Sequence, residues 1–374
     1  MKLSQETLSD YQIQELLTRT DYRTAELTRS YGDHALAFFG LAPENLHFLT
    51  PDGEGLVNYR LIGKVAVVPG DPICAPEARE QVTRTFLEFC THQKWSAVFY
   101  QTSSEYLEEY RTLKLHTFKM GEEAVLNPQT FTLCGSALAN VRTSCRRAER
   151  EGVVIQWYEG VPPTEVIPQL AQVSNTWLKH KAGEQASERG FSMGRLDELV
   201  EAAERADMIA GSTMPTHVSQ CSTPRLLTGV ALTSSGTVCA FVTFTPTYGL
   251  LLNQVTEADS QSAVQGSGWT LDLMRRAPDA PPGVMELLLV RAIEQMRSYG
   301  ASRLSLGLVA WGDTREEMTS TQQQFTSFVA DRLGLLGSRK TLFNFKQKFN
   351  PRWESRYIVG TTLASPAVIL ALLR

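Results

Sequence analysis

The chain is poor in cysteine, and its six cysteines never stand in the C-x-x-C spacing of a zinc ribbon or a dithiol redox motif; they are Cys74, Cys90, Cys134, Cys145, Cys221 and Cys239. The six histidines have no metal-ligand spacing, and neither a Walker motif nor an H-E-x-x-H sequence is present. We therefore expect no metal and no cofactor. A reducing cytoplasm is the expected compartment.

The chain also has no long apolar run. Its first thirty residues are mixed polar, which fits neither a signal peptide nor a transit peptide. The longest apolar stretch, 358–373, is shorter than the roughly 18 residues of a spanning helix and is interrupted by Gly360 and Pro366. We expect a cytoplasmic protein whose C-terminal tail can lie on the inner face of the membrane without crossing it.

An excess of positive charge is missing as well. The 36 lysines and arginines face 40 aspartates and glutamates, so the net charge of -4 excludes a uniformly basic coat for nucleic acid. Any polyanion must be held by local basic patches. With 43% hydrophobic residues over 374 positions, the chain has the composition of a folded protein of two or three domains.

One order of elements occurs twice along the chain, which predicts a duplicated α+β fold with mixed sheets flanked by helices. Each copy has a meander of short strands, a helix, a strand, a second helix and a last strand. The first copy covers 46–68, 76–95, 96–100, 104–113 and 116–119. The second covers 225–232, 238–246 and 248–255 as its meander, then 283–300, 303–308, 321–333 and 341–345. Two helices, 135–151 and 162–181, are expected between the copies.

This order resembles the GNAT acyltransferase fold, and local strings resemble the catalytic domain of the phosphatidylglycerol lysyltransferase family, also called the multiple peptide resistance factor. The strings occur in the family's order: PGDP at 69–72, GEEA at 121–124, FSMGR at 191–195, DLMRR at 272–276, PGVME at 282–286 and FKQKFNPRWESRY at 345–357. The sequence departs from the family in three places. The family's flippase portion has no counterpart, 208–225 reads as an extra loop, and 309–312 replaces an Ala-Pro-Leu-like turn.

The resemblance implies two tandem GNAT-like subdomains, an N-terminal one at 1–134 and a catalytic one with the apolar tail at 152–374, joined by a helix at 135–151. It implies transfer of an amino acid of lysine or alanine type from aminoacyl-tRNA to a hydroxyl of phosphatidylglycerol or a related lipid. Such an exchange between esters needs a base, cations for phosphate and tRNA, and donors for the oxyanion.

Two groups of residues are candidates for this chemistry. Asp272, Arg275 and Arg276 have i, i+3, i+4 spacing, so one helical turn can present an acid beside a phosphate clamp; a surface salt bridge is the alternative. Glu286 follows Pro282-Gly283, where a site role and stabilisation of a helix N-terminus are equally compatible with its position.

Lys346 and Lys348, which lie between Phe345 and Phe349, share one face if this segment is a strand, and two cations on one face suggest a site for a polyanion; a solvated sheet edge is the alternative. We expect Asp272, Arg275, Glu286 and Lys346 to be catalytic. Arg276 and Lys348 are expected to bind substrate.

Contacts to tRNA are predicted at two basic segments. Arg142, Arg146 and Arg150 form a stripe at i, i+4 spacing, and Arg352 and Arg356 extend the basic C-terminal segment; a solvated charged face is the alternative. By the resemblance, Glu184 and Ser192 line the aminoacyl pocket, whereas as isolated residues they would be capping or loop groups.

Three other functions stay open from the sequence. The first is a GNAT that uses acyl-CoA, although the glycine-rich pyrophosphate loop is not found in the required spacing. The second is tRNA-dependent aminoacylation of a sterol, another lipid or a peptide. The third is a non-catalytic protein that binds lipid or tRNA.

Overall fold

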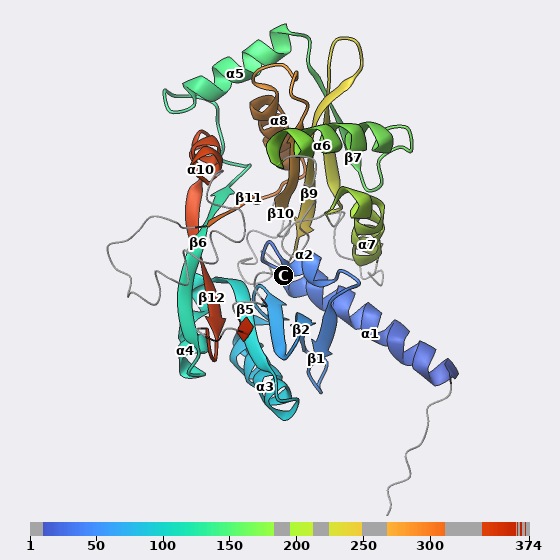
Figure 1. Ribbon diagram of the computed structural model, residues 1–374, viewed down its shortest axis with the longest axis vertical. Helices are drawn as coiled ribbons and strands as arrows, with labels where there is room; N and C mark the ends of the chain where they lie inside the picture. Colours follow the sequence, from blue (N-terminus) through green and yellow to red (C-terminus); the bar gives the residue numbers. More distant parts are fainter. Residues whose placement is uncertain are drawn as a thin grey trace, which may run out of the picture.

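The computed structural model describes residues 10–182, 195–211, 224–248, 268–310 and 339–363, and residues 365, 367, 368 and 371 of the tail. Its strands form one twelve-stranded mixed sheet in the order β1-β2-β3-β5-β12-β6-β11-β10-β9-β8-β7, with β4 paired to β2. Helices pack on both faces of this sheet (Figure 1). The expected α+β class with mixed sheets is confirmed.

The first half begins with helices α1 (Asp10–Tyr31) and α2 (Ala37–Gly40). Strands β1 (Leu46–Leu49), β2 (Gly55–Ile62), β3 (Val65–Pro69) and β4 (Ile73–Cys74) follow, then helix α3 (Arg79–His92) and strand β5 (Ser96–Ser103). Helix α4 (Leu107–Thr112) and strand β6 (His116–Leu126) complete it. Strands β3 and β5 are parallel neighbours, so α3 is a crossover helix between them.

The second half repeats this arrangement after helix α5 (Ala139–Arg150). It contains β7 (Val154–Glu159), α6 (Ile167–Ala182), α7 (Leu199–Gly211), β8 (Leu227–Leu232), β9 (Val238–Thr247), β10 (Gly268–Arg276), α8 (Val284–Ser298) and β11 (Arg303–Ala310). Strands β10 and β11 are parallel neighbours joined through α8. Helices α3 and α8 therefore occupy corresponding crossover positions, as the repeated order predicted.

The last strand connects the two halves. Helix α10 (Arg339–Gln347) leads into β12 (Arg352–Gly360), which pairs antiparallel with both β5 and β6 of the first half. Strand β6 in turn pairs with β11 of the second half. Each half thus receives hydrogen bonds from the other, and the division at 134 and 152 stays a prediction.

Two buried clusters cover opposite faces of the second half. Helices α5 and α8 pack on one face through residues such as Val141, Leu288 and Ile293. Helices α6 and α7 pack on the other through Leu170 and Ala203, and α1 and α2 join them there through Ala25 and Phe38. No helix among the described residues is both long and apolar enough to cross a membrane.

Two local predictions were wrong. Residues 272–276 belong to strand β10 and not to a helix, because 274–276 pair with β9 and these ladder bonds outweigh the i, i+4 charge spacing. Residues 341–345 belong to helix α10 and not to a strand, since its residues pack inward at helical spacing. The predicted helix 321–333 and most of the predicted strand 248–255 lie outside the described residues.

Candidate functional site

The parallel strands β10 and β11 separate along their length. They pair only from Gly268 to Thr270 and from Arg303 to Ser305. Beyond these residues the register of each strand shifts. In β10 the pairing with β9 shifts between Leu271 and Met274, and in β11 the pairing with β6 shifts between Ser305 and Leu308. A gap of this kind at the carboxyl ends of two parallel strands exposes main-chain groups that a substrate can reach.

Lys346 from helix α10 lies at this gap. Its side chain is almost fully buried, and its Nζ donates hydrogen bonds to the carbonyl oxygens of Gly307 at 2.8 Å and Leu308 at 3.2 Å. Burial lowers the pKa of this amine to about 7, although the negative charge of Glu123 acts in the opposite direction. Near neutral pH the amine can therefore both accept and release a proton.

Asp272 and Arg275 lie on β10, beside this gap. The Asp272 Oδ2 accepts a hydrogen bond of 3.4 Å from the Thr243 hydroxyl, and the Arg275 guanidinium is buried 4.1 Å from the centroid of the Trp177 ring. A Cβ on Gly307 would lie 3.5 Å from the Lys346 Nζ and 3.9 Å from the carbonyl oxygen of Leu271. Gly307 thus lies near both the Lys346 amine and the main chain of Leu271, whereas the Asp272 carboxylate contacts Thr243 on β9.

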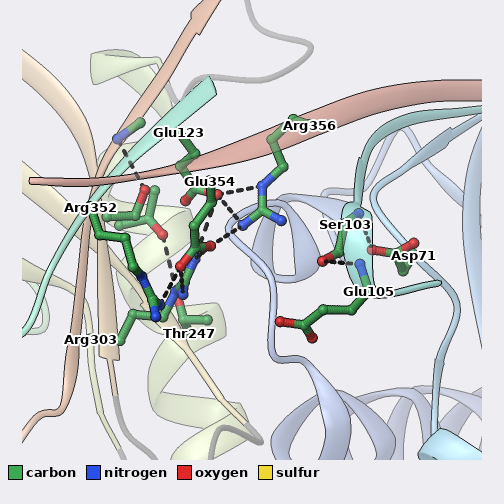
Figure 2. Close-up of polar contacts among 12 residues, drawn as sticks. Asp71, Ser103, Glu105, Glu123, Thr247, Arg303, Arg352, Glu354 and Arg356 are labelled. Atoms are coloured by element: carbon green, nitrogen blue, oxygen red, sulfur yellow. Dashed lines mark hydrogen bonds and ion pairs between the residues drawn. The ribbon is translucent and has the colours of Figure 1, made fainter. Parts of the chain in front are cut away.

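A buried ion network lies where β6, β11 and β12 meet (Figure 2). The Arg356 Nε donates to Glu123 at 2.6 Å, and Arg303 donates two hydrogen bonds to Glu354 at 3.0 and 2.8 Å. Burial alone would raise the pKa of Glu123, but Arg356 and Arg303 lower it to about 2. Arg352 adds a further bond to Glu354 from the surface.

This network forms part of the wall of a cavity of about 870 Å³. Acidic and polar side chains of the first half line one end, namely Asp33, His34, Asp71, Ser103, Glu105 and Tyr106. Charged and apolar residues line the rest, namely Arg303, Arg352, Glu354 and Arg356 with Val125, Leu126, Phe131, Leu138 and Phe349, together with polar residues such as Asn127 and Asn350. The cavity therefore has ends of different charge and polarity.

The other predicted residues have varied surroundings. Glu286 is buried and accepts a hydrogen bond of 2.7 Å from Lys348, which joins α8 to the turn after α10. Arg276 is exposed at the end of β10. Lys348 is 42% exposed in this ion pair, and the roles predicted for both residues stay predictions. Glu184 and Ser192 lie outside the described residues.

The predicted basic stripe on α5 is only partly available to a ligand. Arg142 donates to the carbonyl oxygens of Leu133 and Gly135, whereas Arg146 and Arg150 are exposed. In the C-terminal segment, Arg352 has a side chain that is 74% exposed, but Arg356 is buried in the ion network.

Glu123, Arg303 and Glu354 were missed in the sequence. A signal was present, because Arg352, Glu354 and Arg356 alternate along one strand and therefore project from one face. That the acid opposite them is Glu123, and not its neighbour Glu122, depends on the register of β12 against β6.

Comparison with known proteins gives a consistent result. The family model described as "Phosphatidylglycerol lysyltransferase, C-terminal" matches residues 24–213 and 217–360. The phosphatidylglycerol lysyltransferase of Bacillus subtilis is 26% identical over 339 residues, which are 90% of this chain and 34% of that protein. The lysylphosphatidylglycerol biosynthesis bifunctional protein LysX of Mycolicibacterium gilvum is 27% identical, with 88% of this chain and 27% of that protein covered. The chain thus spans about a third or less of the length of these relatives.

Solved structures agree in fold. The structure of L-PGS from Bacillus licheniformis has a TM-score of 0.70 at 22% identity, with 94% of each chain covered. FemX has a TM-score of 0.56 at 8% identity, with 94% of this chain and 98% of that chain covered.

Proposed function

Because the chain belongs to the family of phosphatidylglycerol lysyltransferase C-terminal domains, we propose that it transfers an aminoacyl group from aminoacyl-tRNA to a hydroxyl of phosphatidylglycerol. The printed functions of the relatives support the lipid acceptor and the lysyl group. The tRNA donor is proposed on chemical grounds, since an aminoacyl ester is already activated and the exchange of one ester for another needs no ATP.

The observation that carries this proposal is the buried Lys346 amine at the gap between β10 and β11. In the proposed reaction the lipid hydroxyl oxygen attacks the ester carbonyl carbon while neutral Lys346 accepts the hydroxyl proton. The bond to the ribose oxygen of tRNA then breaks, and Lys346 returns the proton to this leaving oxygen. A base with a pKa near the working pH suits both halves of this exchange.

Asp272 and Arg275 are proposed to orient the donor at the same gap. A half-buried carboxylate can accept hydrogen bonds from the α-ammonium group of the aminoacyl ester, and a guanidinium can hold a phosphate oxygen. We also propose that Arg146 and Arg150, which are exposed on α5, contact the tRNA backbone.

The start of α8 argues against acyl-CoA as the donor. In a β-α-β crossover, the N-terminus of the helix offers free main-chain N–H groups that can bind a pyrophosphate. The corresponding point in this chain is the start of α8, which follows β10. Here α5 packs directly on that point, because a Cβ on Gly283 would lie only 2.1 Å from the carbonyl oxygen of Ser144. A main-chain carbonyl thus occupies the space beside the helix end that a pyrophosphate would need.

The test is a transfer assay with purified protein, labelled lysyl-tRNA and alanyl-tRNA, and vesicles that contain phosphatidylglycerol. We expect labelled lipid with lysyl-tRNA and no stimulation by acetyl-CoA. Lys346→Met should reduce the rate by a factor of about 10² or more, whereas Lys348→Met should not. If labelled lipid does not form with either tRNA, the proposed function is wrong. If Lys346→Met and Lys348→Met lose activity equally, the proposed role of Lys346 is wrong.

A further inference from the structure

The two carbonyl groups that hold Lys346 belong to one irregular turn of strand β11. Gly307 and Leu308 lie at the register shift of this strand, and Gly307 has a φ of +83°, a conformation that favours glycine. Both carbonyl oxygens accept a hydrogen bond from the Lys346 Nζ, at 2.8 and 3.2 Å. A neutral amine that donates its two hydrogens to these oxygens keeps its single lone pair in one fixed direction. The turn therefore orients Lys346 as a base.

Ser305 holds this turn from inside the sheet. It is 1% exposed, and its Oγ accepts a hydrogen bond of 3.0 Å from the main-chain N–H of Gly307. The hydroxyl also acts on Glu123, which the register of β6 places opposite Leu308. Burial would raise the pKa of this carboxylate, and the Ser305 hydroxyl is one of the groups that lower it. A chain of contacts thus leads from Glu123 through Ser305 to the carbonyl that holds Lys346.

The Glu123 carboxylate also acts on the Lys346 amine through its charge. Burial lowers the pKa of this amine, and the negative charge of Glu123 raises it. The buried part of the ion network (Figure 2) has two carboxylates, Glu123 and Glu354, and two guanidinium groups, Arg303 and Arg356. Its charges balance while Lys346 is neutral. In a buried site of low polarity, removal of one of these charges changes how strongly a nearby amine holds a proton.

Other charged groups near the gap have partners of their own. On β10, Asp272 contacts Thr243, and the Arg275 guanidinium lies against the Trp177 ring. The lysine two positions after Lys346 is paired with the start of α8. Among the described residues, Glu123 is therefore the carboxylate that favours the charged form of Lys346.

We propose that Glu123 and Ser305 are positioning residues for the base: the Ser305 hydroxyl holds the two carbonyls in place, and the Glu123 carboxylate decides how readily Lys346 keeps its proton. The inference rests on the proposed function, in which Lys346 takes a proton from the lipid hydroxyl and returns it to the tRNA ribose. An unopposed carboxylate would keep Lys346 charged, and without a carboxylate the amine would be too weak a base. Arg303 and Arg356 hold the charge of Glu123 between these extremes.

The first test is a titration of the Lys346 amine that needs no turnover. The full chain is labelled with carbon-13 at the lysine ε carbon, and the NMR signal of Lys346 is the one lost in Lys346→Met. Its titration midpoint should move down by about one pH unit in Glu123→Gln and up in Arg303→Gln, because these changes leave opposite net charges in the network. Glu122→Gln is the matched control, since it removes a neighbouring, half-buried carboxylate bonded to Lys119, and its midpoint should equal that of wild type.

The opposite signs separate this role from a structural one. A loss of packing would expose the amine and raise the midpoint in both variants. Glu354→Gln removes the other carboxylate of the network and should also lower the midpoint, so the test remains available if Glu123→Gln does not fold.

The second test is the kinetics of aminoacyl transfer. The acid limb of kcat against pH should follow the NMR midpoint in Glu123→Gln and Arg303→Gln. Ser305→Ala removes the support of the turn but no charge, so it should reduce kcat about tenfold with unchanged KM for both substrates.

The results that would overturn the proposal are specific. A midpoint that stays unchanged in the carboxylate and arginine variants, or that rises in all of them, would mean that Glu123 does not set the proton affinity of Lys346. A wild-type kcat in Ser305→Ala would mean that Ser305 does not position the base. If the wild type forms no labelled lipid, the proposed function fails instead, and the NMR titration still decides the effect of Glu123.

Discussion

Replacing Lys346 by methionine should make the stability of the protein less dependent on pH. Burial lowers the pKa of this amine from 10.5 to about 7, which corresponds to about 5 kcal/mol of unfavourable free energy when it is charged in the folded state. Between pH 7 and 10.5 the unfolded chain binds more protons at this site than the folded chain does. The stability of the wild type should therefore rise with pH across this window, relative to the variant.

Urea unfolding of both proteins at pH 6 and pH 9, followed by circular dichroism, measures this effect. The unfolding free energy of the wild type, measured relative to that of Lys346→Met, should rise by about 3 kcal/mol from pH 6 to pH 9. The two carbonyl oxygens of Gly307 and Leu308 lose their donor in the variant, which costs about 1 kcal/mol each but hardly depends on pH.

Lys348→Met is the control, because it removes a partly exposed lysine that is paired with Glu286, and its difference from wild type should be similar at pH 6 and pH 9. If the difference between Lys346→Met and wild type is the same at pH 6 and pH 9, the buried amine does not titrate near neutrality. The proposed proton transfer through Lys346 would then lose its basis.

Three further predictions concern the sheet and its charges. Glu123→Gln should lower the unfolding free energy by about 3 to 5 kcal/mol in urea, because Arg303 and Arg356 would then share the carboxylate of Glu354 and one buried positive charge would stay uncompensated. A chain that ends at Asn350 lacks β12 and should fail to fold in both halves, as measured by limited proteolysis, since β5 and β6 lose their common neighbour. Arg146→Glu should weaken tRNA binding and reduce its salt dependence without changing Tm, whereas Arg142→Ala should lower Tm because the loop carbonyls lose their donor.

Each of these predictions has its own control. Glu122→Gln removes a neighbouring, half-buried carboxylate bonded to Lys119 and should cost less than about 1 kcal/mol. A protease-resistant first half in the shortened chain would mean that β12 is not needed there. Equal loss of tRNA binding in Arg142→Ala and Arg146→Glu, at unchanged Tm, would contradict the division of α5 into a structural and an exposed arginine.

Much of the architecture could be predicted because it is local. Apolar periodicity and turn residues are properties of short segments, and they gave the meander, the crossover helices and the strands β5, β9 and β11 close to their observed positions. The same reasoning was wrong at 272–276, where the spacing of the charged residues predicted a helical turn and the structure has strand β10. A segment in the centre of a sheet obtains its conformation from neighbouring strands that are distant in sequence.

The sequence by itself determined the residue types of the site, and tertiary structure decided how they can act. Lys346 was identifiable as a candidate, but its altered basicity comes from burial at a gap between strands that lie some forty to seventy residues away in the chain. Glu123 and Arg356 are 233 positions apart, and they meet only because β12 inserts between β5 and β6. No local pattern encodes such a pairing, since its free energy depends on which strands the whole sheet brings together.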